Sequence, residues 1–160
     1  MSNDVFGYIS PIQPAQANAI WAELANAAAS LCLGLRRIAV NDLYGVRTDH
    51  LEPRELIAFR VTDGSDRESA SYLIDLVDYD PGFSLPLGAK GTERFGRLLQ
   101  WLEAAVALAK DRPLVVVLTD ANTLEATREI EASGLERELL SDSRRYAPPN
   151  TAYTIVSRSS

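Results

Sequence analysis

Apolar residues recur every three or four positions in two long segments of this chain. The first segment runs from residue 14 to residue 33, and the second from residue 92 to residue 110. This period is that of an α-helix with one buried face. A stretch rich in proline and glycine, residues 80–91, comes directly before the second segment and predicts a loop. The pattern therefore predicts two long amphipathic helices, the second of which begins at the end of a loop.

A third, shorter helix is predicted at residues 121–135. Leu124, Thr127 and Ile130 fall near one helical face, and Gly134 can adopt the positive φ of a helix end. The surrounding residues are largely acidic, so this helix is expected to expose a charged face to solvent.

Runs of Ile, Val, Leu and Tyr outside the helices predict the strands of a sheet. The consecutive apolar residues 114–118 predict a strand that is covered on both faces. Because this strand directly follows a helix, it is expected to enter the sheet by a parallel crossover. The other predicted strands are 5–10, 36–46, 55–64, 69–80 and 151–158.

The order of these elements predicts one α/β domain that spans residues 1–160, a mixed β-sheet with helices on both faces. A chain of 160 residues is long enough to bury one substantial core. With 46% hydrophobic and 24% charged residues, the composition is that of an ordinary globular protein.

Charge and cysteine usage narrow the function classes. The formal net charge of −6 disfavours nonspecific binding to nucleic acid. No apolar run is long enough to span a bilayer and the N-terminus lacks signal-peptide features, so a cytoplasmic protein without membrane contact is expected. The single cysteine, Cys32, excludes an intramolecular disulfide, and its apolar neighbours predict a buried thiol. The single histidine, His50, lies in a polar stretch and is expected to be a solvated loop residue.

The layout of the chain resembles that of the GNAT N-acetyltransferases, and the resemblance covers most of the sequence. In that family a strand leads into a glycine-rich loop and a long helix, followed by a strand and a short helix that ends near a glycine. The corresponding segments here are "SYLIDLVDYD" (71–80), "KGTERFGRLLQWLEAAVALA" (90–109), "PLVVVLTD" (113–120) and "TLEATREIEASGL" (123–135). The resemblance implies a GNAT-like fold and transfer of an acetyl or other acyl group from acyl-CoA to an amine.

The resemblance also implies a pyrophosphate loop at the start of the second long helix. The family's loop has Arg or Gln, two free positions, Gly, one free position, then Gly or Ala. When this pattern ends on Gly96, Gly91 stands at its first position and Arg94 at its first glycine, so only the last position fits. Backbone N–H groups at a helix N-terminus bind phosphate, and an arginine can pair with it from outside. The implied cofactor-binding residues are Val77 on the preceding strand, Gly91, Arg94, Gly96 and Arg97. The alternative is that these residues only start a helix.

For the chemistry, a carboxylate before the loop would draw a proton from the amine through water, and Asp78 is the candidate. The tyrosine that often serves the family as general acid falls on Ile130, which has no proton to donate. Tyr146 is the candidate replacement, with Tyr153 as a second choice. Both tyrosines also have an explanation as packing residues of the sheet.

Two other functions remain open from the sequence. A small acidic chain suits a non-catalytic binding protein, such as an immunity protein, antitoxin or secretion chaperone, that neutralises a basic partner. Magnesium-dependent phosphate chemistry would need Asp75, Asp78, Asp80 and Asp120 to converge. Because side chains alternate along a strand, Asp75 faces away from Asp78 and Asp80, and no metal site is predicted.

Overall fold

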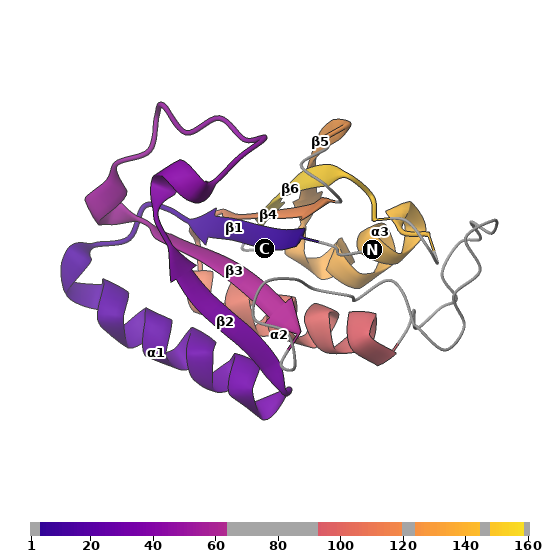
Figure 1. Cartoon of the computed structure of the whole chain (residues 1–160), viewed down its shortest axis with the longest axis horizontal. Coiled ribbons are helices and arrows are strands. Elements are labelled where there is room, and N and C mark those ends of the chain that lie inside the picture. The colour runs from indigo at the N-terminus through magenta and orange to yellow at the C-terminus, as the bar shows by residue number, and fades with distance from the viewer. Residues whose placement is uncertain (1–3, 64–92, 120–123, 145–147, 159–160) are drawn as a thin grey trace.

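The computed structural model describes residues 4–63, 93–119, 124–144 and 148–158. These residues form three α-helices and six strands (Figure 1). The helices are α1 (Pro14–Ser30), α2 (Glu93–Ala109) and α3 (Leu135–Asp142). The strands are β1 (Asp4–Ile9), β2 (Leu33–Ile38), β3 (Ile57–Asp63), β4 (Leu114–Thr119), β5 (Ala126–Glu131) and β6 (Thr151–Val156).

The six strands form one mixed sheet in the order β2-β3-β1-β4-β6-β5. All neighbouring pairs are antiparallel except β5 and β6, which are parallel. Strands β1 and β2 therefore run in the same direction with β3 between them, and β3 and β4 do so with β1 between them. These are two interleaved β-α-β units, the arrangement called ferredoxin-like. The β5-α3-β6 unit extends the sheet beyond β4.

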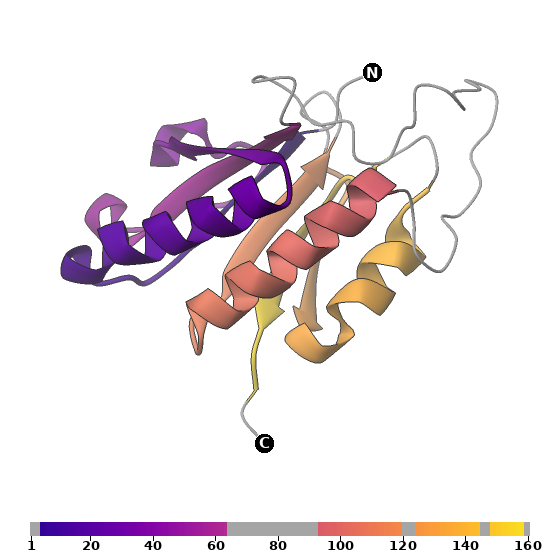
Figure 2. The same ribbon diagram turned by 90° about the horizontal axis from the view of Figure 1, so that it is seen from below.

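The three α-helices lie side by side along one face of the sheet (Figure 2). Both interleaved crossovers place their helices on that face when each is right-handed, as β-α-β crossovers almost always are. Their core includes Leu24, Trp101 and Leu139, and the indole N–H of Trp101 donates to the carbonyl oxygen of Leu24 at 3.1 Å. Helices on both faces, as the sequence predicted, are thus not confirmed among the described elements.

The face of the sheet opposite the three helices, here called the second face, is covered in part by the connection between β2 and β3. In Figure 1 this connection and α1 lie on opposite sides of β1. It contains two short 3-10 helices, Val40–Asp42 and Pro53–Glu55, and buries Leu43 and Leu56 against Phe6 of β1. A loop segment therefore covers part of the face on which the sequence predicted helices.

The centre of the sheet follows the sequence pattern closely. Strand β1 confirms the short strand predicted at 5–10, and every residue of β4 is buried, as the apolar run predicted. Helix α2 connects β3 to β4, which run in the same direction, but β1 lies between them. Gly7 allows β1 to approach β4 closely, because a Cβ there would meet the carbonyl oxygen of Val115 at 1.9 Å.

The predicted helix at 121–135 is wrong, since residues 126–131 form β5. Arg128 and Ile130 face the helices, whereas Glu129 and Glu131 point to the second face, so the period is two. Gly134 ends a short 3-10 helix, Ala132–Gly134, directly before α3, and its φ of −104° is not the positive value that was predicted. Two further predictions are wrong. Strand β2 starts at Leu33, earlier than predicted. Cys32, which was predicted to be buried, is exposed in the turn before β2, with φ 58°.

Candidate functional site

Several residues that the sequence singled out lie outside the described part of the chain. They are Val77, Asp78, Gly91 and Tyr146, together with the other aspartates weighed for a metal, Asp75, Asp80 and Asp120. Among the described residues, no group of three or more His, Cys, Asp or Glu side chains is placed to hold a metal ion. The GNAT-like arrangement also stays a prediction, because the strand and loop that carry it fall in residues 64–92.

The remaining predicted cofactor-binding residues lie in the first turns of α2. This helix begins at Glu93, so Arg94 and Gly96 lie at its N-terminal end, and Arg94 already interacts with another group of the protein. Arg97 follows in the next turn, and its Nε is buried without a hydrogen-bond partner. Buried polar groups usually have a partner, and Arg97 Nε is a buried side-chain atom of the described residues that lacks one.

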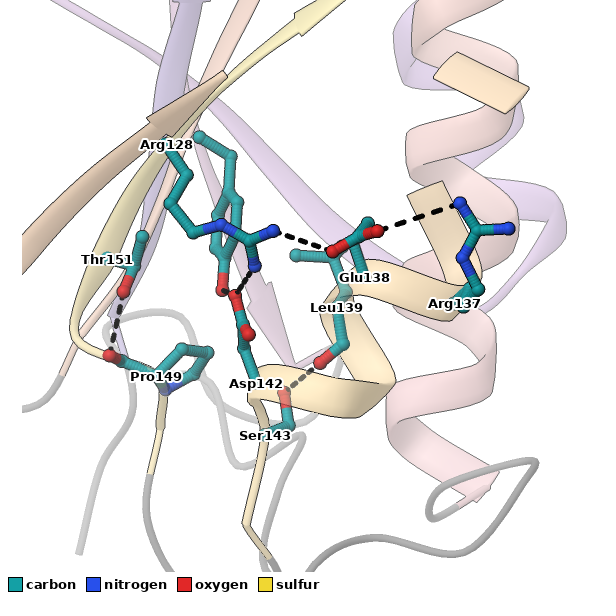
Figure 3. Close-up of polar contacts among 9 residues, drawn as sticks. Arg128, Arg137, Glu138, Leu139, Asp142, Ser143, Pro149 and Thr151 are labelled. Atoms are coloured by element: carbon teal, nitrogen blue, oxygen red, sulfur yellow. Dashed lines mark hydrogen bonds and ion pairs between the residues drawn. The ribbon is translucent and has the colours of Figure 1, made fainter. Parts of the chain in front are cut away.

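A cluster of polar residues joins α3 to β5 and β6 and is here called the Arg128 cluster (Arg128, Glu138, Asp142 and Tyr153). Figure 3 shows the guanidinium of Arg128 reaching from β5 to Glu138 and Asp142 on α3. Its Nη2 donates to Glu138 Oε2 at 2.6 Å, and its Nη1 donates to Asp142. The hydroxyl of Tyr153 also donates to Asp142, at 2.9 Å. Each charged group in the cluster therefore has an opposite charge beside it.

The titration behaviour of this cluster fits a structural role. Burial and the hydrogen bond to Asp142 raise the pKa of Tyr153 far above its ordinary value. The hydrogen bond from Arg128 lowers the pKa of Glu138. A tyrosine that is fully buried and bonded to a carboxylate is poorly placed to donate a proton to a substrate. The packing explanation of Tyr153 is therefore favoured over its role as general acid.

A pocket of about 440 Å³ opens on the second face, between the sheet and the connection from β2 to β3. Tyr8 of β1, Val115 of β4 and Thr154 of β6 form its floor, since these residues point to the second face in adjacent strands. We call it the Tyr8 pocket. Tyr8 is only 8% exposed, and its hydroxyl has no hydrogen-bond partner among the described residues. Burial raises the pKa of Tyr8, so the hydroxyl stays protonated.

The exposed residues that line the Tyr8 pocket include two glutamates and the only histidine of the chain. Glu52, Glu55 and His50 line the opening, and all three are exposed. The backbone here is held in place, since the Ile12 N–H donates to the Glu55 carbonyl oxygen at 2.6 Å. Neither glutamate side chain forms an ion pair within the described part of the chain. The pocket therefore has a hydrogen-bonded backbone along one side and two glutamates that no described residue neutralises by an ion pair.

A second pocket of about 390 Å³ lies further along the second face, beside β2 and β3. Arg36 and Arg60 stand directly opposite each other in the sheet register and line it with Tyr44. All three side chains already interact with other groups of the protein. We therefore assign this pocket no ligand.

The sequence predicted His50 as a solvated loop residue, and this is confirmed, but it did not indicate the pocket beside it. Tyr8, Glu52 and Glu55 come together only because β1 lies at the centre of the sheet and the connection folds back over it. The available signal was a tyrosine in a short, largely apolar strand segment, followed at once by Ser10 and Pro11.

Comparison of the chain with models of known families, with curated proteins and with solved structures found no match. A membrane-crossing helix is also not among the described helices, none of which has the length and apolar character needed. The function proposed below is therefore inferred from the geometry of the Tyr8 pocket and of the start of α2.

Proposed function

We propose that this chain is a non-catalytic binding protein that holds a basic segment of a partner protein on its second face. The observation that carries the proposal is the Tyr8 pocket, which is lined by the largely buried Tyr8, whose hydroxyl bonds to no described residue, and by the exposed Glu52 and Glu55. Binding sites commonly combine apolar walls with a few convergent polar groups. A cation entering this pocket would neutralise two carboxylates and supply a partner for the hydroxyl.

The charge of the molecule supports the same partner. The net charge is −6, so a basic protein would be attracted from a distance. Next to the pocket, Thr154 of β6 stands opposite Glu129 of β5, whose carboxylate also points to the second face. Arg158 binds Glu129 at 3.3 Å and partly neutralises it. The strongest local attraction is therefore expected at Glu52 and Glu55.

The proposal can be tested by titrating the labelled protein with a short peptide in which arginine and lysine alternate with serine. Amide chemical shifts should change at Tyr8, Val115 and Thr154 and remain constant along α1 and α2. The affinity should fall as salt is added, because exposed charges are screened. A peptide in which glutamate replaces the basic residues is the control and should cause no shift changes.

Exchanging carboxylates for amides gives a matched comparison. Glu52→Gln with Glu55→Gln should abolish the shift changes, whereas Glu23→Gln with Glu103→Gln removes the same charge from exposed positions on α1 and α2 and should preserve them. If both double variants weaken binding equally, the attraction comes from net charge alone and the site is not the Tyr8 pocket. Shift changes confined to the helices would contradict the proposal outright.

A second candidate function is transfer of an acyl group from acyl-CoA to an amine. It is favoured by Arg97, whose buried Nε lacks an acceptor beside the first turn of α2, where the resemblance to the GNAT family expects the pyrophosphate. A phosphate would approach the N-terminal end of α2, where Gly96 has no side chain to obstruct it, and Arg97 would supply a charged donor.

Calorimetric titration with acetyl-CoA separates this candidate from the first. Micromolar binding that Gly96→Glu and Arg97→Gln abolish, and that Tyr8→Phe leaves unchanged, would support acyl-CoA binding. Absence of heat with acetyl-CoA and with longer acyl-CoAs would end this candidate.

A further inference from the structure

We propose that the Tyr8 pocket is specific for a guanidinium group, so that the partner inserts an arginine side chain there. This inference rests on the proposed function and names the chemical group that anchors the partner. It follows from the shape of the pocket and from the number and kind of acceptors around it.

The walls of the pocket suit the stem of a long side chain. Pro11, Leu51, Pro113 and Val115 give it apolar sides, and its volume of about 440 Å³ leaves room for one extended side chain with water. Arginine can bury its methylene stem along apolar surface while the charged head meets polar groups. The apolar sides therefore favour an amphipathic side chain over a small hydrated ion.

The acceptors favour guanidinium over ammonium. The pocket is lined by Tyr8, which is largely buried, and by Glu52 and Glu55, which are exposed. Guanidinium carries five N–H donors in one plane and is weakly hydrated, so it can reach floor and rim together. Ammonium is compact and strongly hydrated and would satisfy one end of the pocket at a larger desolvation cost.

The Tyr8 hydroxyl is the group in the pocket whose hydrogen bonding should depend most on which ligand is bound. It belongs to a side chain that is more than nine-tenths buried, and no described residue bonds to it. This hydroxyl would be bound more strongly by a charged donor than by a neutral one, because hydrogen bonds to ions are stronger than neutral ones. Tyr8→Phe removes this one oxygen and keeps the ring that forms the floor.

The test uses three small probes that differ only in the head group: N-acetyl-arginine amide, N-acetyl-lysine amide and N-acetyl-citrulline amide. Amide shifts at Tyr8, Val115 and Thr154 should saturate with the arginine probe, and the lysine probe should bind about tenfold more weakly. Citrulline has nearly the shape of arginine without its charge and should cause no saturable shift. Tyr8→Phe should weaken the arginine probe about tenfold, and Glu23→Gln should leave it unchanged.

The outcomes separate this inference from the proposed function. If arginine and lysine probes bind equally, or if citrulline binds as well as arginine, specificity for guanidinium is overturned while binding of a basic segment stands. If no probe shifts the pocket residues but the basic peptide does, the anchor is elsewhere on the second face. If the peptide itself leaves the second face unchanged, the proposed function fails and this inference with it.

Discussion

Two tyrosines on adjacent parts of one sheet have opposite surroundings. Tyr153 points to the helices, and its hydroxyl donates to Asp142 within the Arg128 cluster. Tyr8 points to the second face, and its hydroxyl has no partner among the described residues. The hydroxyl of Tyr153 therefore has its partner within the protein, whereas Tyr8 lines a pocket that Glu52 and Glu55 also line. The comparison indicates that polar groups serve stability where their partners are present and mark a binding site where a partner is missing.

The charges around the two tyrosines differ in the same way. Arg128 contacts both carboxylates of its cluster, so α3 is fastened to β5 and β6. Glu52 and Glu55 have no such cation in the described part of the chain. Substitutions in the Arg128 cluster should therefore change the free energy of unfolding, whereas substitutions in the Tyr8 pocket should change the free energy of binding.

The largest effect on stability is expected from Tyr153→Phe. This change removes the hydroxyl that bonds to Asp142 in a fully buried position, and it should lower the free energy of unfolding by about 1–2 kcal/mol. Urea unfolding followed by circular dichroism measures the difference. An unchanged free energy of unfolding would show that this hydrogen bond contributes no net stability, and Tyr153 would then not differ from Tyr8 in this respect.

The acid sensitivity of the Arg128 cluster should be the next largest effect. Arg128 lowers the pKa of Glu138 in the folded protein below its ordinary value of 4.5. The stabilisation is therefore present above pH 4.5 and is lost as the pH falls through the lowered pKa of the folded state. Glu138→Gln should make the loss of stability between neutral and acidic pH less steep in urea unfolding. An equally steep loss in the variant would place the acid sensitivity elsewhere.

Tyr8→Phe should change the free energy of unfolding by less than about 0.5 kcal/mol, because the hydroxyl has no bond to lose and the ring remains packed. Thermal unfolding of Tyr8→Phe and Tyr153→Phe under the same conditions makes the comparison direct. A loss at Tyr8 as large as the loss at Tyr153 would indicate a hidden partner and would argue against a binding role.

The smallest effect is expected from Arg137→Gln. The side chain of Arg137 is 78% exposed, and its nitrogen lies 3.6 Å from Glu138, at the edge of the cluster. Exposed ion pairs contribute little to stability, so unfolding should not change measurably. Arg128→Gln in parallel should destabilise the protein clearly, because it leaves Glu138 and Asp142 without their shared cation.

Much of the fold was predictable because its determinants are local. The helical period gave α1 and α2 within a few residues, and the apolar run at 114–118 gave a fully buried β4. The acidic segment around Ile130 was predicted wrongly, because Leu124, Thr127 and Ile130 fit a helical face although residues 126–131 alternate as a strand. A short, polar edge strand carries too few apolar residues for its period to be recognised.

The candidate site was not predictable in the same way. Its floor joins residues of β1, β4 and β6, and its rim comes from a loop more than forty positions away from Tyr8. These residues meet because of the strand order, which the hydrophobic pattern does not specify. The residues that the resemblance to the GNAT family indicated lie in α2 or outside the described residues, so the Tyr8 pocket emerged only from the fold.

The most direct test of this account is the affinity of the basic peptide for Tyr8→Phe and for Tyr153→Phe, measured by calorimetry side by side. We expect Tyr8→Phe to weaken binding about tenfold, because a hydrogen bond to a cation is lost, and Tyr153→Phe to bind like the unaltered protein. Equal affinities of the two variants, or a loss confined to Tyr153→Phe, would contradict the assignment of the Tyr8 pocket as the binding site.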